Sequence, residues 1–163
     1  MPSVMLKVVT MHVLELKVPP VAVVLVTVAL MWLVATAVPA FEFGFPARDV
    51  FALSLAVAGA VVSLSGVVSF KRAKTTVNPM KPDSSSSLVS SGVYALTRNP
   101  MYLGFLLILA GWAVFLSNVL GLLLLPVFVF YMNRFQIEPE ERALAILFGP
   151  AFTAYQSRVR RWL

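Results

Sequence analysis

The chain has 163 residues, of which 60% are hydrophobic and 12% charged, and its formal net charge is +6 at pH 7. This composition is too apolar for a soluble domain and predicts one integral membrane domain. With no cysteine and a single histidine, His12, the chain lacks a disulfide framework, a cysteine nucleophile and the ligands of an ordinary zinc or haem site, so no metal is expected. The cations flank apolar runs instead of forming a basic stripe, which favours the lipid bilayer over nucleic acid as partner.

The first half of the chain contains two uncharged runs, residues 18–38 and 50–70. Each has 21 residues, enough to cross a hydrocarbon core of about 30 Å as a helix. The residues before the first run predict a short interfacial helix. Small residues in the second run, among them Gly59 and Gly66, predict close packing against other helices.

A third uncharged run, residues 99–133, has 35 residues, which is too long for one span and slightly short for two. Asn99 followed by Pro100 is typical of a helix start, with Asn99 as the cap. Ser117 and Asn118, followed by Gly121, are the best turn signal inside the run. We therefore expect a tight helical hairpin, and about four transmembrane helices in an all-α fold.

After this run the chain is expected to return to water. Pro139, with glutamates around it, predicts a new helix that ends at Gly149 and Pro150. A second short helix should then present Phe152 and Tyr155 on one side. We expect these short C-terminal helices to be cytosolic.

The distribution of cations predicts the topology. With four spans, all lysines and arginines except Arg48, 12 of 13, fall on one side, which the positive-inside rule makes cytoplasmic. Both termini should then be cytoplasmic. We divide the single domain 1–163 into residues 1–70, with the interfacial segment and two membrane helices, and a core at 71–163.

Two polar patches, residues 87–102 and 134–141, should meet at the base of the hairpin. Arg98 and Arg134 would lie near each other there and would repel unless Glu138, Glu140 or Glu141 paired with one of them, or a ligand anion lay between them. Interfacial anchoring, or a structural ion cluster, is the simpler interpretation of these side chains. Motifs of soluble enzymes, such as a glycine-rich dinucleotide loop, are missing from the sequence.

Four motifs stand in or near these patches: Gly92-Val93-Tyr94, Arg98-Asn99-Pro100-Met101-Tyr102-Leu103-Gly104, Glu140-Glu141-x-x-Leu144 and Phe148-Gly149. They resemble the isoprenylcysteine carboxyl methyltransferase family, whose wider clan includes membrane phospholipid methyltransferases. The resemblance implies a membrane enzyme that binds S-adenosyl-L-methionine in a cytosol-facing pocket and takes a lipophilic substrate, isoprenoid or lipid, from the bilayer. The expected cofactor-binding residues are Leu88, Val89, Tyr94, Arg98, Asn99, Pro100, Met101, Tyr102, Glu140 and Glu141.

The resemblance also implies that residues 84–89 form an ordered lid, where composition alone predicts a flexible linker. Asn99 stands where the family more often has histidine, so this position cannot carry a proton. Arg134 is the expected catalytic residue, meeting the carboxylate of a prenylcysteine-like substrate, with Gln136 as the other residue that could occupy that position.

Carboxyl O-methylation needs positioning and removal of water but no general base. Methylation of a lipid amine would instead need a base, for which Glu138, Glu140 and Glu141 are available. A non-enzymatic membrane scaffold and a membrane reductase are the other functions considered, and the chain looks short for a nicotinamide dinucleotide site.

Overall fold

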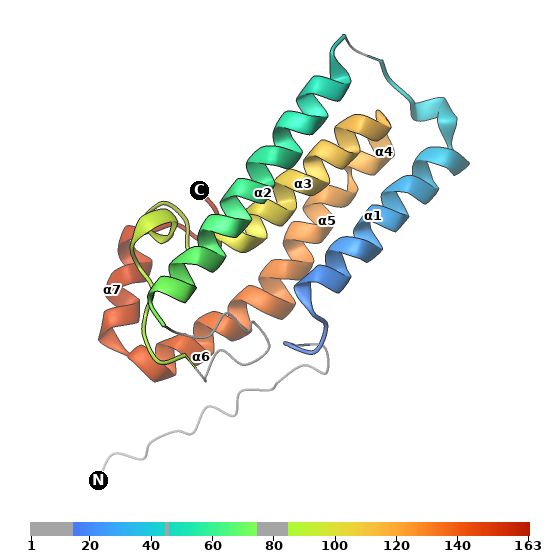
Figure 1. Cartoon of the computed structure of the whole chain (residues 1–163). Helices are drawn as coiled ribbons and strands as arrows, with labels where there is room; N and C mark the ends of the chain where they lie inside the picture. Colours follow the sequence, from blue (N-terminus) through green and yellow to red (C-terminus); the bar gives the residue numbers. More distant parts are fainter. Residues whose placement is uncertain (1–14, 45, 75–84) are drawn as a thin grey trace.

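Figure 1 shows a computed structural model of the chain, which describes residues 15–44, 46–74 and 85–163. Those ranges contain helices and one isolated bridge between Glu42 and Asn118, with no β-strand, which confirms the all-α class. The predicted interfacial helix and His12 lie mostly or wholly outside the described residues. The helices are α1 (Pro20–Ala37), α2 (Arg48–Arg72), α3 (Pro100–Leu116), α4 (Val119–Leu122), α5 (Leu124–Tyr131), α6 (Glu138–Phe148) and α7 (Pro150–Arg158), with 3₁₀ turns η1 (Pro39–Phe41) and η3 (Gly92–Ala95) and a π-helical turn η4 (Met132–Ile137).

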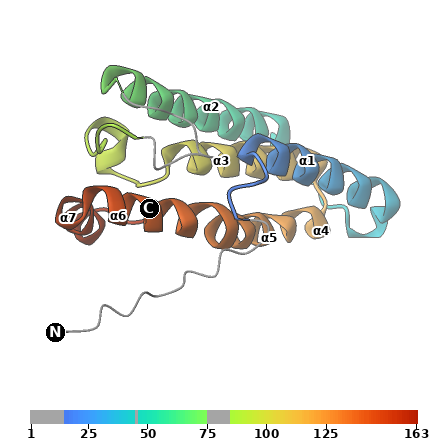
Figure 2. The ribbon, with the colours of Figure 1, turned by 90° about the horizontal axis from the view of Figure 1, so that it is seen from below.

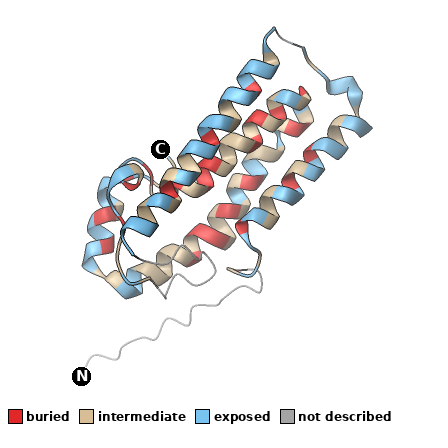
Figure 3. Cartoon of the chain, in the orientation of Figure 1, coloured by how far each residue is buried: buried red, intermediate tan, exposed pale blue. Residues whose placement is uncertain are grey.

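Within the described residues, three stretches are long and apolar enough to cross a membrane: α1, α2 and the helical segment Val119–Phe148. The helix α3 is also apolar but has only 17 residues. Large apolar side chains on α1 and α2, such as Leu25 and Leu64, are more than 60% exposed. Figure 3 shows exposed positions along both helices. Exposed apolar faces of this extent are expected where lipid, not water, surrounds the helix.

The helix α3 lies inside the bundle and contacts α1, α2, α4 and α5. Figure 2 shows α2 and α3 running side by side, with α5 and α6 beneath them. The backbones of α2 and α3 approach so closely that a Cβ added at Gly59 would lie 2.5 Å from the Gly104 carbonyl oxygen. A Cβ at Gly104 would lie 2.4 Å from the Gly59 carbonyl oxygen. The predicted close packing of the second run is therefore present at Gly59, and it fixes the start of α3 against α2.

The predicted break at residues 117–118 is confirmed. Ser117 adopts a left-handed conformation with φ 50° after the last turn of α3. The Asn118 side chain then caps α4 by accepting hydrogen bonds from the backbone N–H groups of Leu120 and Gly121. Arg48, the one cation predicted on the far side, lies at this end and donates to Ser117 Oγ at 3.4 Å.

The predicted helix is present as α6, with Pro139 in its first turn, but it does not follow a break in the chain, because α4, α5, η4 and α6 belong to one helical segment, Val119–Phe148. An α-helix would pair the Phe135 carbonyl with the N–H of residue 139, which proline lacks. The wider π-helical turn η4, immediately before Pro139, carries the chain past this position without a break. The predicted end of the helix is confirmed: Gly149 has φ 49°, and Pro150 begins α7.

Candidate functional site

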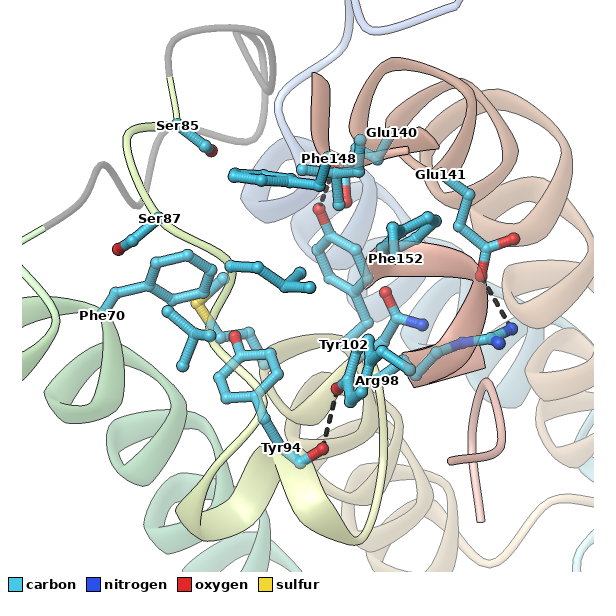
Figure 4. Close-up of a pocket in the computed structure, with 16 residues that line it drawn as sticks. Phe70, Ser85, Ser87, Tyr94, Arg98, Tyr102, Glu140, Glu141, Phe148 and Phe152 are labelled. Atoms are coloured by element: carbon cyan, nitrogen blue, oxygen red, sulfur yellow. Dashed lines mark hydrogen bonds and ion pairs between the residues drawn. The ribbon is translucent and has the colours of Figure 1, made fainter. Parts of the chain in front are cut away.

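A cavity opens at the end of the bundle where α2 ends, α3 begins and α6 and α7 meet (Figure 4). Its wall combines aromatic and aliphatic side chains with one arginine and two glutamates. This is the mixture that binds an amphipathic small molecule, with apolar surface for contact and a few polar groups for orientation. The lining residues are Phe70, Ser85, Ser87, Leu88, Val89, Tyr94, Arg98, Asn99, Met101, Tyr102, Glu140, Glu141, Leu144, Phe148, Phe152 and Tyr155.

Tyr94 forms one aromatic corner of the cavity. It lies on η3, and its ring contacts the Phe70 ring edge-on, with centroids 5.2 Å apart. The Tyr155 hydroxyl donates to the Tyr94 carbonyl oxygen at 2.7 Å, which ties α7 to η3. Burial raises the pKa of both phenols, of Tyr155 to about 12 and of Tyr94 further. Both side chains are therefore neutral hydrogen-bonding groups at physiological pH.

Arg98 and Glu141 form the charged corner. The Arg98 guanidinium lies 2.9 Å from a Glu141 oxygen and donates to the Gln156 carbonyl oxygen at 3.2 Å. Arg161 binds the other Glu141 oxygen at 2.6 Å. Within the described part of the chain, the buried Nε of Arg98 has no hydrogen-bond partner. Buried donors in this state are rare and need a ligand or an ordered water.

Glu140 lies between Tyr102 and Gln136. One of its oxygens accepts hydrogen bonds from the Tyr102 hydroxyl and from Gln136 Nε2, the latter at 2.6 Å. Figure 4 shows the Tyr102 ring crossing the cavity from α3 toward the Glu140 carboxylate on α6. Two donors from different helices thus fix the orientation of this carboxylate.

The C-terminal residues complete the site from behind. The backbone N–H of Arg98 donates to the Arg160 carbonyl oxygen at 3.0 Å, and Asn99 Nδ2 donates to the Arg161 carbonyl oxygen at 2.9 Å. The predicted capping role of Asn99 was therefore wrong, because no side-chain cap is made at the start of α3 and the amide holds the C-terminal chain instead. Pro100 does occupy the first turn of α3, as predicted.

Of the ten expected cofactor-binding residues, nine line the cavity and Pro100 does not. Arg134, the expected catalytic residue, is not among the lining residues. Its guanidinium lies 2.8 Å from the buried carboxylate of Glu15, and 3.9 Å from Glu138. Arg98 and Arg134 therefore do not share an anion site: Arg98 pairs with Glu141, and Arg134 with Glu15. Gln136, the other residue considered, contacts Glu140 at the cavity.

Sequence reasoning missed part of the wall. Phe70 is the last apolar residue before the cations that end α2, and only the fold brings it to Tyr94. Phe152 and Tyr155 were predicted to share one side of their helix, and this side proves to be the cavity wall. Ser85 and Ser87 also line the cavity, as the lid interpretation of residues 84–89 implies, whereas Ser84 lies outside the described residues.

Comparison with known proteins supports the family resemblance that the sequence motifs indicate. A model of the family described as phospholipid methyltransferase matches residues 47–151, which include most of the cavity wall. The chain belongs to this family. The motifs of the chain predicted a resemblance to isoprenylcysteine carboxyl methyltransferases, and relatives named protein-S-isoprenylcysteine O-methyltransferase confirm it.

The similarity to these methyltransferases extends over about two thirds of the chain. The chain is 28% identical over 109 residues to protein-S-isoprenylcysteine O-methyltransferase B of Arabidopsis thaliana, and the match covers 67% of this chain and 55% of the relative. It is 30% identical over 133 residues to the Saccharomyces cerevisiae protein-S-isoprenylcysteine O-methyltransferase, covering 72% and 54%. An uncharacterized protein of Haemophilus influenzae is 44% identical over 63 residues, which is 39% of this chain and all of that protein. The chain thus spans about half the length of the named methyltransferases, and no solved structure matches it.

Proposed function

We propose that this protein is an integral membrane methyltransferase that binds S-adenosyl-L-methionine in the cavity and methylates a lipophilic acceptor. The observation that carries the proposal is the meeting of the family's two motifs, from residues 98–102 and 140–144, in one wall beside the aromatic residues of α2 and α7. Because the chain belongs to a methyltransferase family, a binding site for the methyl donor is the simplest interpretation of this cavity.

The residues of the cavity suit the cofactor's functional groups. The guanidinium of Arg98, with its unpartnered buried Nε, is suited to the amino-acid carboxylate. Glu140 and Glu141 are suited to the cationic ammonium and sulfonium or to ribose hydroxyls, and the rings of Tyr94 and Phe152 to the adenine base. Bound S-adenosylmethionine would supply an activated methyl group, so the protein's task is to align the acceptor and exclude water.

We propose carboxyl O-methylation of a prenylcysteine-like lipid as the leading reaction, since the named relatives are isoprenylcysteine O-methyltransferases. The charges of the cavity favour lipid amine N-methylation as the second candidate. Among the lining residues that the structure describes, Arg98 is the only cation, and it already binds Glu141. Glu140, held by Tyr102 and Gln136, could accept the proton that an ammonium must lose before transfer.

Four spans, with α3 and α5 as the arms of a hairpin, form part of this proposal. All described cations except Arg48 belong to the end of the bundle that carries the cavity, which supports a cytoplasmic cavity and cytoplasmic termini. A lipophilic acceptor would then approach from the inner leaflet.

The test is methyl transfer from methyl-labelled S-adenosylmethionine by the purified protein in lipid nanodiscs. Mild alkali releases labelled methanol from a methyl ester formed on an N-acetylated S-prenylcysteine, whereas an N-methyl group on an aminolipid resists it. Carboxylate transfer should be constant from about pH 6 to 8, and amine transfer should fall below the pKa of the amine. Failure to label either acceptor, together with failure to bind S-adenosylhomocysteine, would contradict the proposal and favour a scaffold.

A further inference from the structure

The residues just before α1 contact the long helical segment Val119–Phe148 at the end of the bundle that carries the cavity. We name residues 15–17 the N-terminal strap. The Glu15 side chain is 1% exposed, and its two oxygens bind two arginines of that segment, Arg134 Nη1 at 2.8 Å and Arg142 Nη2 at 2.5 Å. The backbone N–H of Leu16 donates to the Phe135 carbonyl oxygen at 3.1 Å.

The contact with Phe135 is made at a position that proline leaves without an α-helical partner. Pro139 has no N–H to offer the carbonyl four residues before it, and its ring would clash with that carbonyl in a regular α-helix. The π-helical turn η4 (Met132–Ile137) relieves the clash, and Leu16 supplies a donor. The strap and Pro139 therefore stabilise the same local departure from α-helical geometry.

This departure determines which side chains reach the cavity. One residue more per turn rotates everything beyond it by about 100° relative to an unbroken α-helix. With η4 in place, Gln136 and Glu140 bond to each other and to Tyr102 at the cavity, whereas Arg134 binds the strap. Residues four apart also meet on an α-helix, so loss of the π-helical turn would leave Gln136 beside Glu140 but turn the pair relative to α5 and away from Tyr102.

We propose that Glu15 and Pro139 are positioning residues for cofactor binding: together they hold the π-helical turn that aims Glu140 into the cavity, with Gln136 bonded to it. The inference rests on the proposed function, because it assigns them to the site that would bind S-adenosylmethionine. Neither residue lines the cavity. The competing explanation is that the Glu15 cluster only stabilises the fold.

Calorimetric titration of S-adenosylhomocysteine into the detergent-purified protein tests the role of Glu15. Glu15→Gln should weaken binding about tenfold in protein that remains folded, because small misplacements of an anchoring group are costly. Glu42→Gln is the matched control, since this carboxylate is exposed and follows η1 at the other end of the bundle, and it should leave affinity unchanged. In a Gln136→Ala background, the Glu15→Gln change should have little further effect, because its action passes through the turn that carries Gln136.

Pro139→Ala separates positioning from stability. Alanine restores the N–H that Phe135 would pair with in an α-helix, so the helix can relax and the protein without ligand should be at least as thermally stable. Affinity for S-adenosylhomocysteine should nonetheless fall about tenfold. Retained affinity in Pro139→Ala, or equal effects of Glu15→Gln with and without Gln136, would overturn the inference. A wild-type protein that binds no S-adenosylhomocysteine would overturn the proposed function, and the inference with it.

Discussion

The contact between α2 and α3 gives a prediction that links packing to the site. In Gly104→Ala, the new Cβ would lie 2.1 Å from Ser63 Oγ, 2.4 Å from the Gly59 carbonyl oxygen and 2.8 Å from the Ser63 backbone nitrogen. Two of these atoms belong to the backbone, so rotation of a side chain cannot relieve the overlap. Overpacking of this kind costs about 1–3 kcal/mol, and here it must push α3 away from α2.

The displacement would also reach the cavity, because Tyr102 and Met101 stand one turn or less before Gly104 on α3. We expect Gly104→Ala to lower Tm in detergent and to weaken S-adenosylhomocysteine binding. Gly121→Ala is the matched control: a Cβ there meets no atom within 4 Å, and alanine favours a helix by about 1 kcal/mol over glycine. A Gly104→Ala protein as stable as Gly121→Ala would refute the close packing of α2 and α3.

Three further predictions concern single side chains. Tyr102→Phe removes a donor to Glu140 and should weaken S-adenosylhomocysteine binding by about 1–2 kcal/mol in calorimetry; it should also lower Tm without ligand, because Glu140 then keeps only Gln136 as donor. Arg134→Ala leaves the buried Glu15 with Arg142 alone and should lower the free energy of unfolding by about 1–3 kcal/mol; unchanged stability would contradict the buried pair. Because burial raises the pKa of Tyr155 to about 12, from about 10 when unfolded, its contribution to stability is constant below pH 10 and is lost as pH rises toward 12. Tyr155→Phe should reduce that alkaline loss in thermal unfolding measured from pH 7 to 11.

Local sequence patterns correctly predicted the helix ends that are set by turn-forming or helix-breaking residues. Ser117 and Asn118 break the third apolar run, and Gly149 with Pro150 ends α6, because each of these residues imposes its own backbone geometry. Much of the cavity wall could be predicted from the motifs that include residues 98–102 and 140–144, which the fold brings together.

The errors arise where distant segments meet. Asn99 is a residue type that often caps helices, but here its side-chain amide donates to the Arg161 carbonyl oxygen and makes no cap. Arg134 was placed at the cavity because a hairpin would bring it near Arg98 and because the family resemblance implies an arginine there, whereas Glu15, 119 residues away in sequence, binds it. Pro139 and its neighbouring glutamates predicted the first turn of α6, but they do not reveal that a π-helical turn joins α6 to α5.

The central claim is that the cavity binds the methyl donor, and thermal unfolding of the purified protein with and without S-adenosylhomocysteine tests it most directly. Ligand at 100 times its dissociation constant should add about 2.7 kcal/mol to the folded state and raise Tm clearly. The increase should be smaller in Tyr102→Phe, whose missing hydroxyl contacts Glu140 in the cavity. No increase in Tm for the wild-type protein at millimolar ligand would contradict the account.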